Sequence, residues 1–130
     1  ILQPNSARRL KTDSSERRIP LVGASLWAAI QAFEVIGGAD EKYLFPRYTK
    51  GGKCNANSAS AALNKWMKNY VEDGCVIHSF RHSMRDRLRE VECPSDIVDQ
   101  IGGWSCSSVG QNYGTGYKLP VLHKWLQMIQ

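Results

Sequence analysis

The sequence predicts one mainly α-helical domain with a small antiparallel β-sheet at its N-terminus, an α+β fold. Two observations carry this prediction. Apolar residues recur at helical spacing from residue 22 onward, and residues 1–21 hold two short runs with turn-forming residues between them. The 130 residues suffice for one hydrophobic core, so residues 1–130 are expected to form a single domain. A content of 42% hydrophobic and 22% charged residues excludes general disorder, and no apolar run approaches the roughly 18 residues of a membrane helix.

Residues 1–21 are expected to form a β-hairpin. Residues 8–12 make the first strand, the turn-forming residues 13–16 follow, and residues 17–21 return. Pro20 has no amide hydrogen to donate, so the return strand is expected to lie at an edge of the sheet or to end there.

Five stripes of apolar residues with helical spacing follow, and each predicts one helix. Four belong to a helical core, residues 22–118, and the last forms a tail helix, residues 119–130. The members, stripe by stripe, are Leu26, Ala29, Ile30, Phe33 and Ile36; Ala59, Ala62, Leu63, Trp66 and Tyr70; Phe80, Met84, Leu88 and Val91; Ile97, Val98 and Ile101; and Leu119, Leu122, Leu126 and Ile129.

Glycines and a proline indicate where the helices begin and end. Two glycines at residues 37–38 follow the first helix, and the second is expected to end near Gly74. Pro94 suits the first turn of the fourth helix, which the glycines at residues 102–103 terminate. Between the first and second helices, residues 47–53 are expected to form a basic, flexible loop.

The charge balance favours an acidic partner without identifying one. Seventeen Lys and Arg against 12 Asp and Glu give a net charge of +5, which is typical of many nucleic-acid-binding proteins and of other basic proteins too. None of the four cysteines sits in a C-x-x-C pair, so neither a zinc site nor a disulfide scaffold is supported. We expect reduced thiols of a cytoplasmic protein at Cys54, Cys75, Cys93 and Cys106.

A helix predicted to start near Ser79 carries the first candidate site residues, His78 and Arg81. At three residues apart, both side chains can point to one side of a helix start. A guanidinium matches two phosphate oxygens, an imidazole can move a proton near neutral pH, and the free amides of a helix start favour anions. By itself, the pair is more simply explained by a capping histidine and a surface arginine.

Two further candidates are Tyr113, nine residues after Trp104, and Lys11 beside the hairpin turn. An exposed tyrosine is a possible nucleophile, but a phenol with a pKa of about 10 needs neighbouring cations and a base. A lysine at a turn can protonate a leaving oxygen. Taken singly, a core aromatic residue and a solvated lysine are the simpler explanations. Tyr117 is a rival nucleophile, which its spacing from Trp104 disfavours.

The order of these signals is more specific than any one of them. Lys11 precedes a turn and an Arg-x-Ile-Pro-Leu strand, His78-x-x-Arg81 follows, and Gly-Gly-Trp104 comes nine residues before Tyr113. This order resembles the C-terminal catalytic domain of the tyrosine recombinases, the phage integrase family. The resemblance extends from the hairpin to the tail.

The resemblance implies site-specific DNA recombination by strand cleavage and rejoining. Tyr113 would attack the scissile phosphate, form a 3′-phosphotyrosine link and release a 5′-hydroxyl. Arg81 would stabilise the charge of the transition state, and His78 would assist proton transfer. Lys11 would protonate the leaving oxygen, and Trp104, where the family more often has histidine, would donate its indole N–H to the phosphate. No metal and no cofactor is implied, because cations supply the electrostatic stabilisation.

The implied partner is double-stranded DNA, in the cytoplasm of a bacterial or phage-infected cell, where the protein would associate with the nucleoid. The tail at residues 119–130 would either dock on a neighbouring subunit of a homo-tetramer on DNA or pack against its own domain. The residues expected to contact DNA phosphates are Arg8, Arg9, Arg17, Arg18, Lys50 and Lys53, with Arg85 as a further candidate.

One arginine of the family's catalytic set has no counterpart in residues 1–130. The chain is therefore expected to be the C-terminal part of a recombinase catalytic domain, to be inactive alone, and to expose apolar side chains such as Trp27 and Phe33. Two alternatives remain open. One is a non-catalytic DNA-binding or assembly remnant of a recombinase, and the other is DNA relaxation of the type IB topoisomerase kind.

Overall fold

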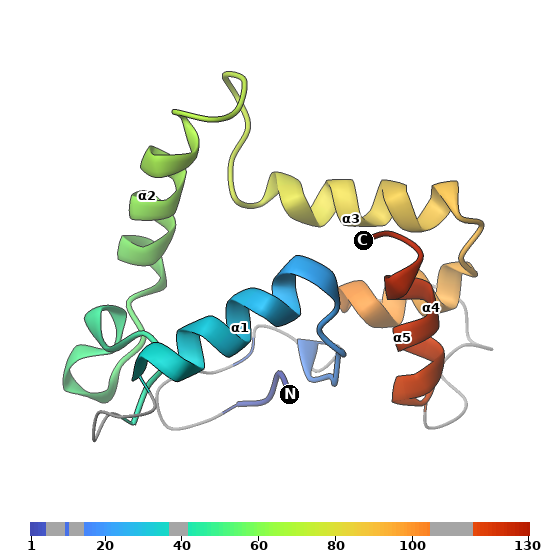
Figure 1. Cartoon of the computed structure of the whole chain (residues 1–130), viewed down its shortest axis with the longest axis horizontal. Helices are drawn as coiled ribbons and strands as arrows, with labels where there is room; N and C mark the ends of the chain where they lie inside the picture. Colours follow the sequence, from blue (N-terminus) through green and yellow to red (C-terminus); the bar gives the residue numbers. More distant parts are fainter. Residues whose placement is uncertain (5–9, 11–14, 37–41, 105–115) are drawn as a thin grey trace.

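The structure, a computed structural model, describes residues 1–4, 10, 15–36, 42–104 and 116–130. This part of the chain is mainly helical, as the sequence predicts (Figure 1). Its helices are α1 (Gly23–Ile36), α2 (Ala56–Met67), α3 (Ser79–Glu90), α4 (Ser95–Gly102) and α5 (Leu119–Gln127), with two short 3₁₀ turns, η2 (Pro46–Tyr48) and η3 (Lys50–Gly52). Within the described ranges, no helix is both long and apolar enough to cross a membrane.

The small N-terminal β-sheet is not confirmed. In the described residues, the only β pairing outside helices is a single antiparallel bridge in which Leu2 and Arg17 exchange backbone hydrogen bonds of 2.8 and 2.9 Å. Arg17 therefore pairs with Leu2 and not with the predicted first strand, most of which lies outside the described residues. Pro20 has no amide hydrogen, so it cannot donate to a longer ladder on this side.

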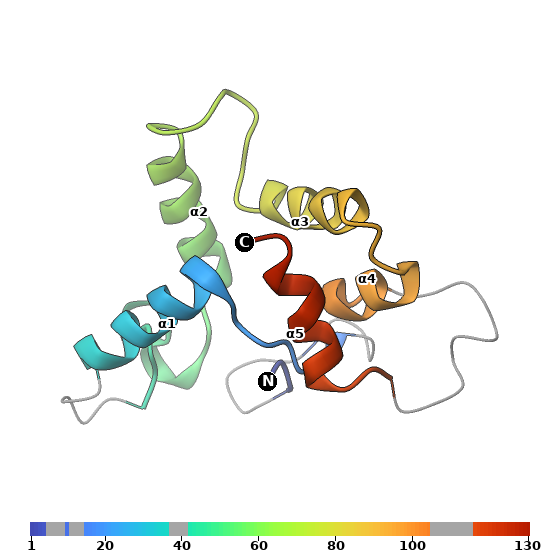
Figure 2. The ribbon, with the colours of Figure 1, turned by 45° about the vertical axis from the view of Figure 1, so that its right-hand side comes forward.

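The core is formed by α3, α4 and α5, which lie together in both views of the ribbon (Figures 1 and 2). Leu88, Ile101 and Leu122, one from each helix, are the largest fully buried side chains. The buried residues of α4 are Ile97, Val98, Ile101 and Gly102, which lie on one side of the helix. This side packs against α3 and α5. The buried cluster consists of Leu88, Cys93, Ile97, Val98, Ile101, Leu122 and Leu126.

The tail packs against its own domain in this structure. Leu122 and Leu126 of α5 are buried in the same cluster as Ile101, with 1% and 6% of their surface exposed. Of the two alternatives for residues 119–130, the contact with the same chain is the one observed. The tetramer on DNA stays a prediction.

α1 and α2 contribute little to this core. α1 has no buried residue, and Met67 is the buried residue of α2. As expected, Trp27 and Phe33 are exposed, with 66% and 69% of their surface open. α2 stands apart from the group of α3, α4 and α5 in both views (Figures 1 and 2). The apolar stripe of α1 thus predicted the helix correctly without identifying what the stripe would contact.

Three local expectations need correction. Residues 47–53, expected to form a basic, flexible loop, hold regular structure in part, because η2 and η3 each close a tight turn there. α2 ends at Met67, before Gly74, since the Tyr70 amide bonds to the Met67 carbonyl at 2.8 Å in a tight turn. Pro94 precedes α4 with extended backbone at ψ 138° and lies just outside its first turn, where its carbonyl accepts the Val98 amide.

Candidate active site

The start of α3 holds His78 in the open. Its side chain makes no capping hydrogen bond, and its ring meets His82 edge-on with the centroids 5.3 Å apart. The turn before α3 is closed by Ser79, whose hydroxyl accepts the Val76 amide at 3.1 Å. Capping therefore does not explain His78, whose imidazole is exposed.

Arg81 reaches from α3 to the C-terminal end of α4. Its Nη1 donates to the carbonyl oxygen of Gly102 at 2.5 Å. The last carbonyls of a helix have no partner in the helix and carry a partial negative charge, so they hold a cation well. Because this bond spans 21 residues and is partly buried, Arg81 is more than a surface arginine.

Trp104 folds back over the end of α4. Its amide donates to the Asp99 carbonyl at 3.0 Å, and its indole lies so close to Gly102 that a Cβ at that position would overlap the ring. The guanidinium carbons of Arg81 and Arg85 lie 4.2 and 4.7 Å from the indole centroid. At these distances the ring face attracts both cations, so the indole helps to orient Arg81.

Arg85 belongs to this cluster more closely than the sequence indicated. Its Nη2 lies 3.6 Å from Oδ1 of Asp99, and its Nε is buried with no hydrogen-bond partner among the described residues. The sequence contained a signal for this position, because Arg85 follows Arg81 by four residues and therefore shares its side of α3.

Arg17 approaches the same place from the N-terminal part of the chain. Its Nε donates to the Ile101 carbonyl at 3.0 Å, and its Nη1 donates to the Ser15 carbonyl at 2.9 Å. Burial, followed by the positive charge of Arg81, lowers the pKa of Arg17 below its ordinary value. The guanidiniums of Arg17 and Arg81 are thus close enough to repel each other. Arg18, the next residue, is exposed.

Tyr117, the rival nucleophile, is engaged elsewhere. Its hydroxyl donates to the carboxylate of Asp96, and this hydrogen bond is the main cause that raises the pKa of the phenol. Gln100 holds the backbone of Tyr117 from both sides, accepting its amide at 2.7 Å and donating to its carbonyl at 2.9 Å. A raised pKa makes the nucleophilic phenolate scarcer, which agrees with the lower rank of Tyr117.

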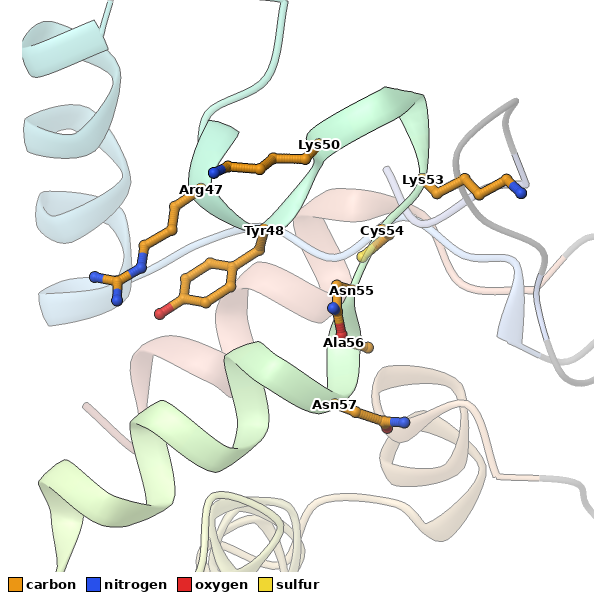
Figure 3. A pocket seen from close by; sticks show the side chains of 8 residues that line it. All are labelled: Arg47, Tyr48, Lys50, Lys53, Cys54, Asn55, Ala56 and Asn57. Atoms are coloured by element: carbon orange, nitrogen blue, oxygen red, sulfur yellow. The ribbon is translucent and has the colours of Figure 1, made fainter.

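A second basic region lies at the N-terminal end of α2, on the side of the fold away from α3 and α4 (Figures 1 and 2). An open cavity of about 450 Å³ is lined there by Arg47, Tyr48, Lys50, Lys53, Cys54, Asn55, Ala56 and Asn57. Figure 3 shows that the side chains of Arg47 and Lys50 project to one side of the loop and that of Lys53 to the other. Lys50 and Lys53 are among the predicted DNA contacts, whereas Arg47 was not singled out.

The structure therefore gathers part of the predicted site. It brings Arg81 and Trp104 together at the end of α4, adds Arg17 and Arg85 beside them, and leaves His78 exposed at the start of the same helix as Arg81. Lys50 and Lys53 lie in the separate basic region. The predicted residues that lie outside the described part of the chain are Lys11, Tyr113, Arg8 and Arg9.

The metal and thiol chemistry of the described residues is limited. They contain no group of three His, Cys, Asp or Glu side chains that could hold a metal ion. Cys54 and Cys75 are free and exposed, and Cys93 is free and buried. Cys106 lies outside the described residues.

Comparison with known proteins identifies the family of the chain. The model of the phage integrase family matches residues 5–118, which is most of the chain. No curated protein and no solved structure matches it. The matched range contains most of the predicted hairpin, the His78–Arg81 pair, Trp104 and Tyr113. On this basis, the chain belongs to the phage integrase family.

Proposed function

We propose that this chain forms the catalytic part of a site-specific DNA recombinase that cleaves and rejoins DNA through a 3′-phosphotyrosine at Tyr113. Membership of the phage integrase family supports site-specific recombination in general. The observation that carries the proposal is the guanidinium of Arg81, fixed between the Gly102 carbonyl and the indole of Trp104. Among the described residues it forms no ion pair with a carboxylate, so its charge is available to a phosphodiester.

The chemistry proceeds in one balanced exchange. The Tyr113 oxygen bonds to the scissile phosphorus while the bond from phosphorus to the 5′-oxygen breaks. His78 takes up the phenol proton, and Lys11 gives a proton to the leaving oxygen. Arg81 stabilises the charge on the non-bridging oxygens, an effect for which the loss of one donor costs on the order of 3–4 kcal/mol. The covalent link conserves the phosphoester, so the reverse exchange rejoins the strand.

The basic region at the start of α2 supports DNA as the partner. Arg47, Lys50 and Lys53 line one cavity in which no acidic residue takes part. Such a group of cations binds the DNA backbone with little dependence on sequence and positions the duplex. Arg18, exposed near the candidate site, adds a further cation that can contact a phosphate.

A nicked suicide substrate tests the proposal. A protein in which this chain is preceded by a segment carrying the missing catalytic arginine of the family, called the longer recombinase below, is expected to form a covalent complex that survives denaturation. The reason is that the nick releases the short 5′-hydroxyl strand and blocks rejoining. Tyr113→Phe removes the nucleophile and should abolish the complex, whereas Tyr117→Phe, the matched control, should retain it. The 130-residue chain alone is expected to form none, since one arginine of the family's catalytic set has no counterpart in it.

The same assay separates the rival functions. A recombinase joins two different DNA sites after cleavage, whereas a type IB topoisomerase only relaxes supercoiled plasmid. Absence of the covalent complex in the longer protein would identify a remnant that binds DNA without cleaving it. A complex that persists in Tyr113→Phe and disappears in Tyr117→Phe would show that Tyr117, and not Tyr113, is the nucleophile.

A further inference from the structure

We infer that Arg17 is a positioning residue of the phosphate site, which orients Arg81 and Trp104 by fixing the C-terminal end of α4. The inference rests on the proposed function and refines it. From the sequence, Arg17 is one of several hairpin cations that contact the DNA backbone. Its contacts in the structure are with the protein's own backbone, and they end beside Arg81 and Trp104.

The guanidinium of Arg17 joins two segments that are far apart in the sequence. Its Nε donates to the Ile101 carbonyl at 3.0 Å while its Nη1 donates to the Ser15 carbonyl at 2.9 Å. The next carbonyl along α4, that of Gly102, accepts Arg81. Two consecutive carbonyls at one helix end thus hold two guanidiniums. A movement of Arg17 therefore shifts the end of α4 and, with it, the Gly102 carbonyl to which Arg81 bonds.

Close packing gives the second link. Gly103 ends α4 in the left-handed region at φ 65°, and a Cβ built there would overlap the guanidinium of Arg17. The preceding glycine, Gly102, has the indole of Trp104 against it in the same way. The Arg17 guanidinium and the Trp104 indole therefore rest on two adjacent glycines of one turn. Displacing the guanidinium frees this turn and, with it, the Trp104 ring that lies against Arg81.

Charge gives the third link. The guanidiniums of Arg17 and Arg81 bond to consecutive carbonyls, so the two positive charges lie near each other, and the charge of Arg81 contributes to the lowered pKa of Arg17. Neither side chain pairs with a carboxylate in the described part of the chain. Holding two cations together without an anion is unfavourable, and the carbonyl end of a helix offsets only part of this repulsion. A phosphate oxygen beside Arg81 would neutralise the pair, so Arg17 prepares the site for an anion.

Arg18 supplies the matched control. It follows Arg17 directly, carries the same charge and is exposed, whereas Arg17 is partly buried. Lysine keeps the positive charge at either position but lacks the planar fork that reaches two carbonyls at once. Arg17→Lys therefore removes the contacts with the two carbonyls and keeps the positive charge. Arg18→Lys also keeps the positive charge and leaves those two contacts of Arg17 in place.

The first experiment uses the chain without DNA. Nuclear magnetic resonance of the indole N–H groups is expected to show a changed Trp104 signal in Arg17→Lys and an unchanged one in Arg18→Lys. The signals of Trp27 and Trp66, which are exposed on α1 and α2, report whether the rest of the fold is intact. An unchanged Trp104 signal in Arg17→Lys would overturn the inference. If Arg17→Lys does not fold, Arg17→Gln is measured in the same way with the same expectation.

The second experiment separates positioning from DNA contact in the longer recombinase. On the nicked substrate at saturating DNA, Arg17→Lys should slow covalent complex formation by about 10- to 100-fold, because misplacement by about 1 Å has an effect of that size. The dissociation constant for the same DNA should change by less than about twofold, as expected when the charge is kept. The control for the rate is Arg87→Lys, at an exposed arginine of α3 for which no DNA contact is predicted, and it should preserve the rate.

Two outcomes of the second experiment contradict the inference. Weaker DNA binding with an unchanged rate would make Arg17 a contact to the DNA backbone. Equal losses of rate in Arg17→Lys and in the control variant would show that Arg17 has no positioning role. If the unsubstituted recombinase forms no covalent complex, the proposed function fails. The Trp104 signal of the free chain then still decides whether Arg17 positions the turn.

Discussion

At the scale of residues, the candidate site is organised by backbone carbonyls. Arg81 and Arg17 bond to the carbonyls of Gly102 and Ile101, where the helix end contributes about 0.3–1 kcal/mol to the binding of a cation. A carboxylate in this position would orient the guanidiniums equally well, but it would also neutralise them. Carbonyl oxygens orient the cations while leaving their charge for a phosphate.

The two glycines Gly103 and Gly51 offer a matched test of this packing. Both adopt left-handed backbone, at φ 65° and 67°, but only Gly103 has a neighbour that a Cβ would meet. Gly51→Ala should lower the free energy of unfolding by about 1–2 kcal/mol, the cost of the left-handed conformation alone. Gly103→Ala should lower it by about 1–3 kcal/mol more, because Arg17 must move. Chemical denaturation measures both, and equal losses would contradict the packing of Arg17 on Gly103.

Cys93 predicts a pH dependence of stability. Burial, followed by the negative charge of Asp96, raises the pKa of its thiol from 9.0 to about 11. The folded state thus favours the neutral thiol, and this contribution to stability is complete below about pH 9 and is lost as the pH rises to about 11. The free energy of unfolding should fall more steeply across this range in the unsubstituted chain than in Cys93→Ala. Parallel slopes in the two proteins would show that the thiol does not contribute.

The same group should also react slowly. Only the thiolate is nucleophilic, so at pH 8 Cys93 should be alkylated by iodoacetamide more slowly than the exposed Cys54 and Cys75. Mass spectrometry of peptides after short labelling times measures the order. Labelling of Cys93 at the rate of Cys54 would show that its surroundings are open.

At the scale of elements, α5 connects the end of the chain to the helix that carries the candidate site. Leu122 and Leu126 pack into the core beside Ile101 of α4, and Gln100 of α4 holds the backbone just before α5. The helix whose carbonyl end holds Arg17 and Arg81 is thus also held by contacts with the tail. Removing the tail should loosen the site as well as the core.

Leu122 and Val121 test the packing of α5. Leu122 has 1% of its surface exposed and its neighbour Val121 has 36%. Leu122→Ala should lower the free energy of unfolding by about 2–5 kcal/mol, since it leaves a cavity in the core. Val121→Ala, which removes two methyl groups at the surface, should cost far less. Urea denaturation compares the two, and a small loss for Leu122→Ala would mean that in solution the tail leaves its own domain.

At the scale of the whole molecule, two basic regions lie on different sides of the fold. One is the cluster of Arg17, Arg81 and Arg85 around Trp104. The other is the cavity at the start of α2, whose lining residues are labelled in Figure 3. In the proposed function, the first region takes the scissile phosphate and the second holds the neighbouring duplex.

The dependence of DNA binding on salt tests the second region. Each phosphate contact contributes about 0.9 to the slope of log K against log salt. The double variant Lys50→Gln, Lys53→Gln should therefore reduce the slope by about 1.8 with a short duplex, measured by fluorescence anisotropy. Lys68→Gln, at the opposite end of α2 and exposed, is the control and should leave the slope unchanged. Equal slopes for all three proteins would show that the duplex does not reach this cavity.

Much of the helical framework and the family followed from local signals in the sequence. The apolar stripes that contain Leu88 and Ile101 predicted α3 and α4, because a helix buries one stripe of its own residues. The glycine at position 103 ended α4 as predicted, since it adopts φ 65°, a conformation that glycine takes easily. The order of His78, Arg81, Trp104 and Tyr113 indicated the phage integrase family, and the family match over residues 5–118 confirms it.

Only the tertiary structure decided which side chains meet. An apolar stripe has the same pattern whether it is covered or open, so the sequence could not distinguish exposed Phe33 of α1 from buried Leu122 of α5. An arginine at the start of a predicted strand looks the same whether it contacts solvent or a helix end 84 residues away, as Arg17 does with Ile101. Such contacts depend on how distant segments pack together, and no local spacing encodes them.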